Sequence, residues 1–395
     1  GALVQYLKEI RPGGISHLKP PRIRRPGKIM LLDEMTRRNL ELIEPLRTGE
    51  QGGTLLDVLD VTETPMGGRL LRRWVLEPLI RAEDICARHD AVEEFVGRPN
   101  LRIRMREALS RVTDLERLAG KVGTGRVTPR DLLGLRKSLE QLPKIQEAGI
   151  QAKDPLIRES AVNKDRLDDV STLLKNAISD DSPATLNEGE VIKKGWSKDL
   201  DELREVRDGA RDFVASLQVR ERERTGIASL KIGFNKVFGY YLEVTRANLG
   251  KVPADYIRKQ TLANAERYFT SELKEWEEKI FSAEDRISHL ESELFSDIRE
   301  RVSLEIGRLQ ETAVRIATLD VLAGFSEVAT SQNYVRPEIH SDFELALVAS
   351  RHPVVETMMP REKFIPNDIC LSQNGRIVVL TGPNMAGKST LLRQV

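Results

Sequence analysis

The segment SELKEWEEKIFSAEDRISHLESEL, residues 271–294, has the most regular apolar pattern of the chain and decides which fold we expect. Its apolar residues recur at alternating steps of three and four, the spacing of the a and d positions of three heptads. These residues are Leu273, Trp276, Ile280, Ala283, Ile287, Leu290 and Leu294. The pattern predicts a long helix that packs along a partner helix. If one helix ran from 262 to 322, it would extend about 90 Å at ~1.5 Å per residue.

A second amphipathic segment, residues 196–222, can supply that partner. Its apolar side chains form one stripe with charged residues between them, the pattern of a long exposed helix. The stripe consists of Trp196, Leu200, Leu203, Ala210, Phe213 and Leu217. We therefore expect two long helices that pair as antiparallel arms.

Between the arms the pattern changes to that of a β-hairpin. Residues 231–245, KIGFNKVFGYYLEVT, alternate β-branched and aromatic residues, with glycines at 233 and 239. Residues 224–259 hold seven basic residues against two acidic ones, although the whole chain has a net charge of only +1. On residue types alone, such a hairpin is explained by solubility about as often as by contact with DNA. The basic residues are Arg224, Lys231, Lys236, Arg246, Lys251, Arg258 and Lys259.

The rest of the chain predicts a helical domain and a change of texture near the carboxyl end. Apolar residues recur at helical spacing over residues 33–142. After Pro337, short apolar runs at 345–348 and 377–380 predict strands of an α/β domain. With 395 residues, 40% apolar and 31% charged, the chain is expected to form two or three globular units. The expected fold is mainly α with a small β insertion, followed by the start of an α/β domain.

Cysteine, histidine and hydropathy patterns exclude several classes of protein. Cys86 and Cys370 are far apart and have no second thiol or histidine at metal-ligand spacing, so neither a disulfide framework nor a zinc site is supported. The histidines never pair at i, i+4. There is no run of eighteen apolar residues and no signal-peptide pattern, so we expect a cytoplasmic protein without a membrane segment.

Residues 382–389, GPNMAGKS, fit the phosphate-loop pattern G-x-x-x-x-G-K-[ST]. The apolar run IVVL at 377–380 precedes the loop and helix-forming leucines follow it, as phosphate binding requires. Glycines at Gly382 and Gly387 let the backbone approach an anion that N–H groups and the positive helix end stabilise. We expect Lys388 to reach the β and γ phosphates of ATP and the Ser389 hydroxyl to ligate Mg²⁺.

At this loop the chain resembles the MutS family of DNA mismatch-repair ATPases. TGPNMAGKST at 381–390 is similar to the Walker A sequence of that family, including its variable positions. RHPVVE at 351–356 resembles the segment upstream of the nucleotide site, and TLANAERYFTSELKE at 261–275 resembles the return from the DNA clamp to the lever. TRRNLEL at 36–42 and TLLDVLD at 54–60 look like the opening of the core domain. The resemblance covers nearly the whole chain.

The resemblance implies a domain order along the chain. Residues 1–211 would form the helical core and first lever arm, 212–271 the DNA clamp, and 272–335 the second lever arm returning to the core. Residues 336–395 would be the start of a P-loop, ABC-type ATPase domain.

The resemblance also implies ligands and partners. The seven basic residues between 224 and 259 match the clamp that grips the backbone of mismatched double-stranded DNA. Phe364 matches the ring that stacks on adenine, although taken alone it is more often a core aromatic, and Asn384 matches a polar contact beside the phosphates. The implied partners are a second subunit in a homodimer and a downstream factor of the MutL type, in a cytoplasmic, nucleoid-associated protein. The implied ATP-binding residues are Phe364, Gly382, Pro383, Asn384, Met385, Ala386, Gly387, Lys388, Ser389 and Thr390.

Some features of the family are expected outside these residues. The mismatch-reading domain with its Phe-x-Glu wedge should precede Gly1, and the Walker B acids and the signature serine should follow Val395. The only Phe-x-Glu here, at 325–327, lies in a helical stretch and is interpreted as packing. We therefore expect this chain to cradle phosphate without catalysing ATP hydrolysis by itself.

Two other classes of protein remain as alternatives. A chromosome-organising ATPase of the SMC or Rad50 type also joins a phosphate loop to coiled coils, but there the loop precedes the coiled coil. A MutS paralogue that promotes recombination and crossover stays open, whereas the branch without a clamp is disfavoured by residues 224–259.

Overall fold

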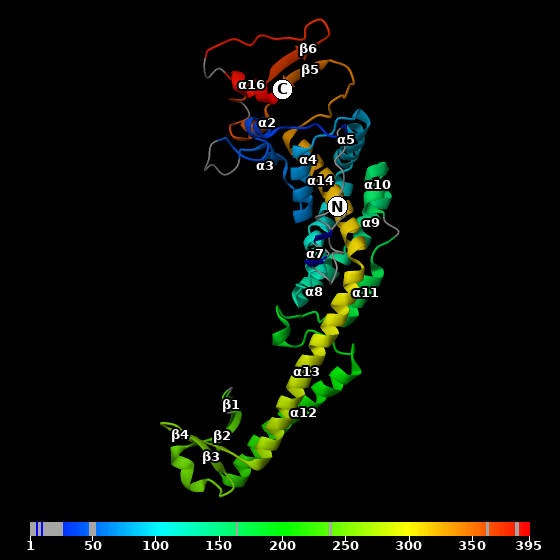
Figure 1. Cartoon of the computed structure of the whole chain (residues 1–395). Helices are drawn as coiled ribbons and strands as arrows, with labels where there is room; N and C mark the ends of the chain where they lie inside the picture. Colours follow the sequence, from blue (N-terminus) through cyan, green and yellow to red (C-terminus); the bar gives the residue numbers. More distant parts are fainter. Residues whose placement is uncertain are drawn as a thin grey trace. The chain divides into compact units, whose positions relative to one another are not determined.

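The computed structural model describes residues 5–6, 9–10, 27–46, 53–162, 165–235, 237, 239–360, 363–383 and 387–395. Most of these residues are helical, and the strands form two small antiparallel sheets (Figure 1). The chain divides into two compact units. Unit 1 comprises residues 1–127, 134–171 and 302–395, and unit 2 comprises residues 128–133 and 172–301. The expectation of a mainly helical fold with a small β insertion is confirmed.

Unit 1 is a helical domain organised around helix α14 (Ile306–Gln332). This helix packs against α3, α4, α5, α6, α7 and α10, and it is apolar on nearly every side, as expected of a helix surrounded by others. The other helices of the unit are α2 (Glu34–Asn39), α3 (Leu55–Leu59), α4 (Pro65–Leu76), α5 (Ala82–Gly97), α6 (Pro99–Leu109), α7 (Leu115–Gly123), α9 (Leu142–Gln151), α10 (Pro155–Ala161), α15 (Pro353–Thr357) and α16 (Lys388–Gln394). Helices α8 (Pro129–Leu139) and α11 (Asp168–Ala177) have residues in both units.

A buried aspartate joins α14 to the start of α4. Asp320 is fully buried and accepts hydrogen bonds from Glu63 N at 2.9 Å, Thr64 N at 2.8 Å and Thr64 Oγ1 at 2.6 Å. Burial raises the pKa of Asp320, while these donors act in the opposite direction. Thr64 also caps α4 by accepting from Gly67 N at 3.0 Å. A Cβ at position 67 would overlap the Asp320 carboxylate, so the close approach requires glycine there.

Unit 2 contains the arm helix α12 (Lys198–Thr225) and residues 271–301 of the second arm helix, α13 (Ser271–Leu304). The two helices lie side by side (Figure 1). Ser197 caps the start of α12, and Gly226 ends it in the left-handed conformation with φ of 65°. Between the arms lie strands β1 (Lys231–Asn235), β2 (Gly239–Thr245), β3 (Ile257–Thr261) and β4 (Ala265–Phe269). They form an antiparallel sheet in the order β1-β2-β4-β3. The short 3-10 helices η1 (Leu186–Glu188) and η2 (Arg246–Lys251) complete the unit.

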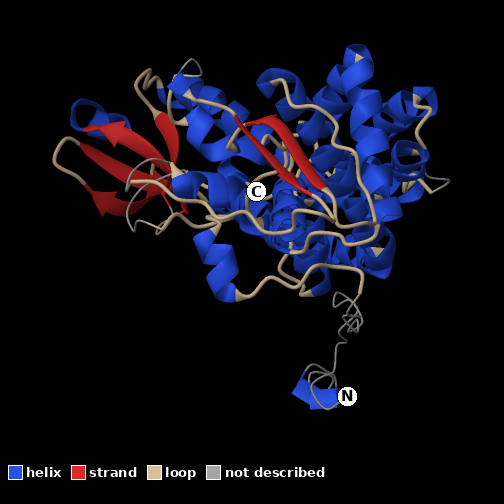
Figure 2. Ribbon diagram, turned by 90° about the horizontal axis from the view of Figure 1, so that it is seen from above, coloured by secondary structure: helices blue, strands red, loops and turns tan. Residues whose placement is uncertain are grey.

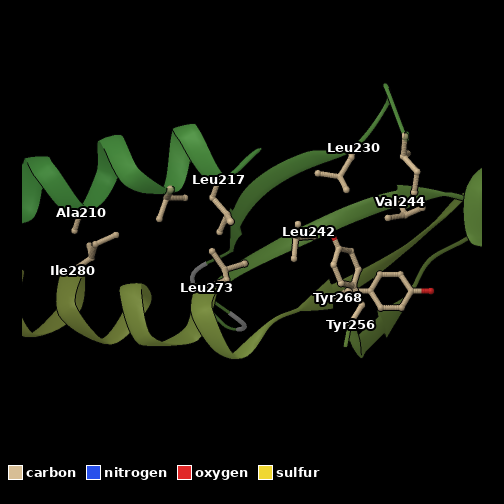
Figure 3. Close-up of a cluster of buried hydrophobic side chains, with 11 residues drawn as sticks. Ala210, Leu217, Leu230, Leu242, Val244, Tyr256, Tyr268, Leu273 and Ile280 are labelled. Atoms are coloured by element: carbon tan, nitrogen blue, oxygen red, sulfur yellow. The ribbon is translucent and has the colours of Figure 1, made fainter. Parts of the chain in front are cut away.

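The predicted heptad seam is the core of unit 2. Ala210 and Leu217 of α12 face Leu273 and Ile280 of α13 (Figure 3). Beside them, the ring of Phe213 stacks on Trp276 with centroids 4.1 Å apart. The same cluster continues into the sheet without a gap in burial. Arms and sheet therefore share one hydrophobic core. The sheet and adjoining residues of this cluster are Ile227, Leu230, Leu242, Val244, Tyr256 and Tyr268.

A single helix from 262 to 322 is wrong. Strand β4 occupies the first part of this range, because its residues pair with both β2 and β3. The helical ladder is interrupted again at Glu305, whose N–H bonds to Val302 O at 3.1 Å, a tighter turn than that of an α-helix. Helix α13 alone has 34 residues and extends about 50 Å at ~1.5 Å per residue.

The carboxyl-terminal segment contains the second sheet, in which β5 (Leu345–Ser350) pairs with β6 (Asn367–Leu371) (Figure 2). The strand predicted at 345–348 is thus confirmed. The run at 377–380 is not a strand in the described structure, and Ile377 and Val379 are 85% and 82% exposed. A buried strand needs hydrogen-bonded neighbours, whereas the residues beside this run form only an isolated bridge between Ser372 and Gly375. The α/β nucleotide domain therefore stays a prediction.

Among the described residues, no helix is long and apolar enough to cross a membrane.

Replacing Gly67 with alanine should destabilise the protein by about 2 kcal/mol or more, because the new methyl group must displace the Asp320 carboxylate. Urea unfolding of the variant measures this loss. Gly120→Ala in α7 is the matched control, since among the described residues a Cβ there meets nothing within 4 Å beyond its chain neighbours and its own helix backbone. That control should gain up to ~1 kcal/mol from helix propensity. Equal unfolding midpoints for the two variants would contradict the proposed steric role of Gly67.

Candidate nucleic-acid and phosphate-binding sites

The basic residues predicted to contact DNA lie on several elements of unit 2. Lys231 begins β1, whereas Arg246 and Lys251 begin and end η2. Arg258 and Lys259 lie on β3, where a register shift separates Arg258 from Gln260. The side chains of Lys231, Arg246, Lys251 and Arg258 are exposed, and that of Lys259 is half-buried. Lys236 lies outside the described residues.

Arg224 differs from the other predicted contacts because two carboxylates already neutralise it. Its Nη2 lies 2.7 Å from Glu221 Oε2 and 3.0 Å from Asp255 Oδ2. Glu221 is buried and also accepts a hydrogen bond of 2.8 Å from the Tyr256 hydroxyl. Hydrogen bonding to Arg224 lowers the pKa of Asp255. Arg224 therefore joins the end of α12 to the loop before β3.

Arg267, which the sequence interpretation missed, organises the solvent-facing side of the sheet. Its Nε donates to Glu243 Oε2 at 3.1 Å and its Nη1 donates to Gln260 Oε1 at 3.0 Å. Its guanidinium also lies 4.1 Å from the centroid of the Tyr241 ring. These contacts cross β2, β4 and β3 in one row. The alternation of AERYF at 265–269 marks this face, but Arg267 stands outside the basic cluster at 224–259.

The described part of the phosphate loop has the backbone expected of its glycines. Gly382 has φ of 150° and Gly387 has φ of 81°, and Gly387 is the N-cap of α16. Lys388 Nζ donates to the carbonyl oxygen of Gly382, so its side chain reaches back across the loop. Ser389 follows in the first turn of α16 and is exposed. The helix start and the lysine thus carry positive potential toward the same loop.

For the remaining predicted ATP-binding residues, the structure gives burial only or no description. Asn384, Met385 and Ala386 lie outside the described residues. Pro383 is exposed and Thr390 is half-buried in α16. Phe364 is half-buried in the segment between α15 and β6, and its stacking on adenine stays a prediction.

The far end of α16 is fixed to other parts of unit 1. Arg393 Nη1 lies 2.6 Å from Glu41 Oε2, and Gln394 Nε2 donates to Ser350 Oγ at 2.6 Å. Glu41 has φ of 48°, a conformation that is uncommon for a residue with a side chain, and its Oε1 also accepts from Leu46 N at 2.9 Å. The helix after the phosphate loop is therefore held by the residues following α2 and by the end of β5.

The segment RHPVVE at 351–356 connects the end of α14 to α15. The sequence alone assigns no role to its individual residues. Arg351 Nη1 lies 2.8 Å from Glu356 Oε2, and its Nη2 donates to the carbonyl oxygens of Gln332 at 2.9 Å and Asn333 at 3.2 Å. Glu356 is 3% exposed, and its Oε1 accepts from the Tyr334 hydroxyl at 2.8 Å. Arg351 thus neutralises a buried carboxylate and caps the carbonyl groups at the end of α14.

His352 strengthens the same junction at the start of α15. Its Nδ1 accepts a long hydrogen bond of 3.4 Å from Val355 N, which makes it the N-cap of that helix. Burial lowers the pKa of His352, and the positive charge of Arg393 lowers it further. The neutral ring, which can accept this hydrogen bond, is therefore favoured.

Comparison with known proteins identifies the family. A family model described as MutS domain III matches residues 35–326. The DNA mismatch repair protein MutS of Pelotomaculum thermopropionicum is 48% identical over 397 residues, which cover 100% of this chain and 46% of that protein. The proteins of the same name from Symbiobacterium thermophilum and Salinibacter ruber are 48% and 45% identical and are covered to 45% and 44%. The chain spans about half the length of the curated relatives it matches.

The fold and these residues define a class of protein with a helical core, paired arm helices, a small sheet between the arms in sequence, and a loop of phosphate-binding sequence. Because the family model covers most of the chain, the chain belongs to the MutS family. Membership in this family sets aside the SMC or Rad50 alternative.

Replacing Arg351 with alanine should lower the free energy of unfolding by about 3 kcal/mol, because it leaves the buried Glu356 carboxylate without its charge partner. Arg351→Lys should recover only part of this loss, since an ammonium group cannot serve both the carboxylate and the α14 carbonyls in a fork. Urea unfolding distinguishes the variants. Arg376→Ala is the control because Arg376 is exposed, and it should change stability by less than ~0.5 kcal/mol. A similarly small effect of Arg351→Ala would refute the role of this junction.

Proposed function

We propose that this chain is the DNA-clamping and transmitting part of a mismatch-repair protein that binds mismatched double-stranded DNA under the control of ATP. The observation that carries the proposal is the segregation of charge. A chain with a net charge of +1 presents exposed Lys231, Arg246, Lys251 and Arg258 on one small sheet and its 3-10 helix. The relatives named DNA mismatch repair protein MutS support the same function.

The proposed contact with DNA is to phosphates rather than to base edges. The clamp consists of strands and a short 3-10 helix, and no long helix lies between the described residues of β1 and β4 to enter a major groove. Exposed lysine and arginine side chains are suited to neutralising the DNA backbone. Lys236 and Lys259 are proposed as further contacts, and Arg224 as one that must exchange Glu221 or Asp255 for phosphate.

The proposed nucleotide is ATP with Mg²⁺. The loop backbone and Lys388 would hold the phosphates, Ser389 would ligate Mg²⁺, Asn384 would contact the nucleotide beside the phosphates, and Phe364 would stack on adenine. Through the contacts of α16 with Glu41 and Ser350, a shift of this helix on nucleotide binding would displace residues of the helical domain. If ATP changes the affinity for DNA through this route, DNA must change the affinity for ATP by the same factor.

The proposed assembly is a homodimer that acts with a downstream factor of the MutL type. This part of the proposal rests on family membership.

Replacing Lys251 with alanine should weaken binding to duplex DNA and reduce the slope of log affinity against log salt by about 0.9, the contribution of one neutralised phosphate. Fluorescence anisotropy titrations of a mismatched duplex at several salt concentrations measure both effects. Arg376→Ala is the comparison, since it removes an exposed positive charge that is not among the proposed DNA contacts. It should leave the salt slope unchanged. DNA affinity that does not depend on salt would show that this surface is not a phosphate clamp.

Replacing Lys388 with alanine should reduce affinity for ATP about tenfold or more, because the loop loses the cation directed at the phosphates. Equilibrium binding of a fluorescent ATP analogue in the presence of Mg²⁺ measures the change. Arg376→Ala removes a positive charge outside the loop and should leave affinity unchanged. Equal affinity of the Lys388→Ala variant and the unmodified chain would remove the nucleotide proposal.

A further inference from the structure

Two of the ion pairs that join the arm helices lie one heptad apart. Arg204 Nη2 lies 2.5 Å from Glu291 Oε1, and Arg211 Nη2 lies 2.6 Å from Glu284 Oε1. From the first pair to the second, the position on α12 rises by seven and that on α13 falls by seven, as antiparallel helices require. Of the two pairs, Arg204–Glu291 is largely buried, whereas Arg211 and Glu284 are partly exposed. A buried polar pair between packed helices favours one register over others. The next heptad positions toward the sheet are Gln218 and Glu277.

At this third position Gln218 and Glu277 bind the β-hairpin rather than each other. A further arginine–glutamate pair between the arms, Arg220 with Glu272, lies outside the heptad repeat. Ile232 N donates to Gln218 Oε1 at 2.8 Å, and Tyr240 N donates to Glu277 Oε2 at 3.1 Å. Ile232 belongs to β1 and Tyr240 to β2, so each arm holds one strand of the hairpin. Strand β1 is at the edge of the sheet, where outward N–H groups have no neighbouring strand to bind.

Gly239 allows the Glu277 carboxylate to reach the hairpin. Its φ is 72°, which favours glycine, and a Cβ at this position would overlap the Glu277 carboxylate. The carboxylate therefore lies directly against the backbone at the start of β2. No residue type with a side chain fits this position without moving Glu277.

We propose that Gln218 and Glu277 are positioning residues, through which the register of the arms fixes the orientation of the β1–β2 hairpin and of Lys231 at its start. The proposal rests on the proposed function for its consequence in DNA binding. Its structural part, that these two side chains hold the hairpin, does not depend on DNA. The acidic character of Glu277 makes the test decisive. Simple electrostatics requires that removing a carboxylate near the clamp strengthen DNA binding, whereas loss of positioning requires that it weaken binding.

Glu277→Ala should weaken binding of the chain to duplex DNA about tenfold, and it should accelerate hydrogen exchange at the Tyr240 amide by at least about tenfold. Glu278→Ala is the matched control, since it removes the same charge from the neighbouring exposed position of α13. This control should leave exchange unchanged and DNA affinity equal or slightly higher. Glu277→Gln keeps an acceptor oxygen and should restore most of both properties.

Register is tested separately by exchanging the charges of one ion pair. Arg211→Glu should accelerate exchange at the Ile232 and Tyr240 amides, and the double variant Arg211→Glu with Glu284→Arg should restore their protection. If Glu277→Ala impairs folding, Gly239→Ala serves as the second variant, because it displaces the carboxylate without removing it.

The outcomes separate this proposal from the proposed function. Unchanged amide exchange in Glu277→Ala and Gly239→Ala would overturn the positioning role whatever DNA binding shows. Faster exchange together with unchanged or stronger DNA binding would overturn its link to the clamp. If Lys251→Ala also left DNA binding unaffected, the failure would belong to the clamp function, and the exchange results would still decide whether Gln218 and Glu277 hold the hairpin.

Discussion

The apolar contact between α12 and α13 is the constraint on which the rest of unit 2 depends. Ala210 and Leu217 pack against Leu273 and Ile280, and this seam continues directly into the inner face of the sheet. A small sheet has too little apolar surface to be stable in water without something to pack against. The arms provide that surface, so the sheet carrying the basic residues exists as a structured element only because the helices pair.

The sequence predicts the parts of the structure that follow from local periodicity, and it fails where distant residues decide. The heptad seam and the hairpin at 231–245 were visible because spacing of three and four and alternation are local properties. The neutralisation of Arg224 by Asp255 and the contacts of Gln218 and Glu277 were not, because they depend on the register of elements far apart in the chain. The run at 377–380 shows that an apolar segment does not become a strand by composition alone. The phosphate loop remains a sequence prediction supported by its two glycines and Lys388.

Buried carboxylates give unit 1 its specific connections. Asp320 holds the start of α4, and Glu356 binds Arg351 and Tyr334 at the end of α14. A buried charge is costly unless its partners are in place, so such contacts favour a few discrete arrangements over gradual displacement. Helix α14 touches both junctions, one within its length and one at its carboxyl end. A displacement of α15 therefore either keeps or breaks the contacts of Glu356 with Arg351 and Tyr334, and in this way it affects the end of α14.

The heptad spacing of the Arg204–Glu291 and Arg211–Glu284 pairs has a mechanical consequence. If one arm slid along the other by a full heptad, about 10 Å at ~1.5 Å per residue, Arg204 would lie opposite Glu284 in the phase that the two pairs define. Any slide would separate Arg204 from Glu291, which is 1% exposed. Sliding of one arm helix along the other is therefore resisted, whereas helices of this length curve at little cost. The pair of arm helices can bend as a unit while its register stays fixed.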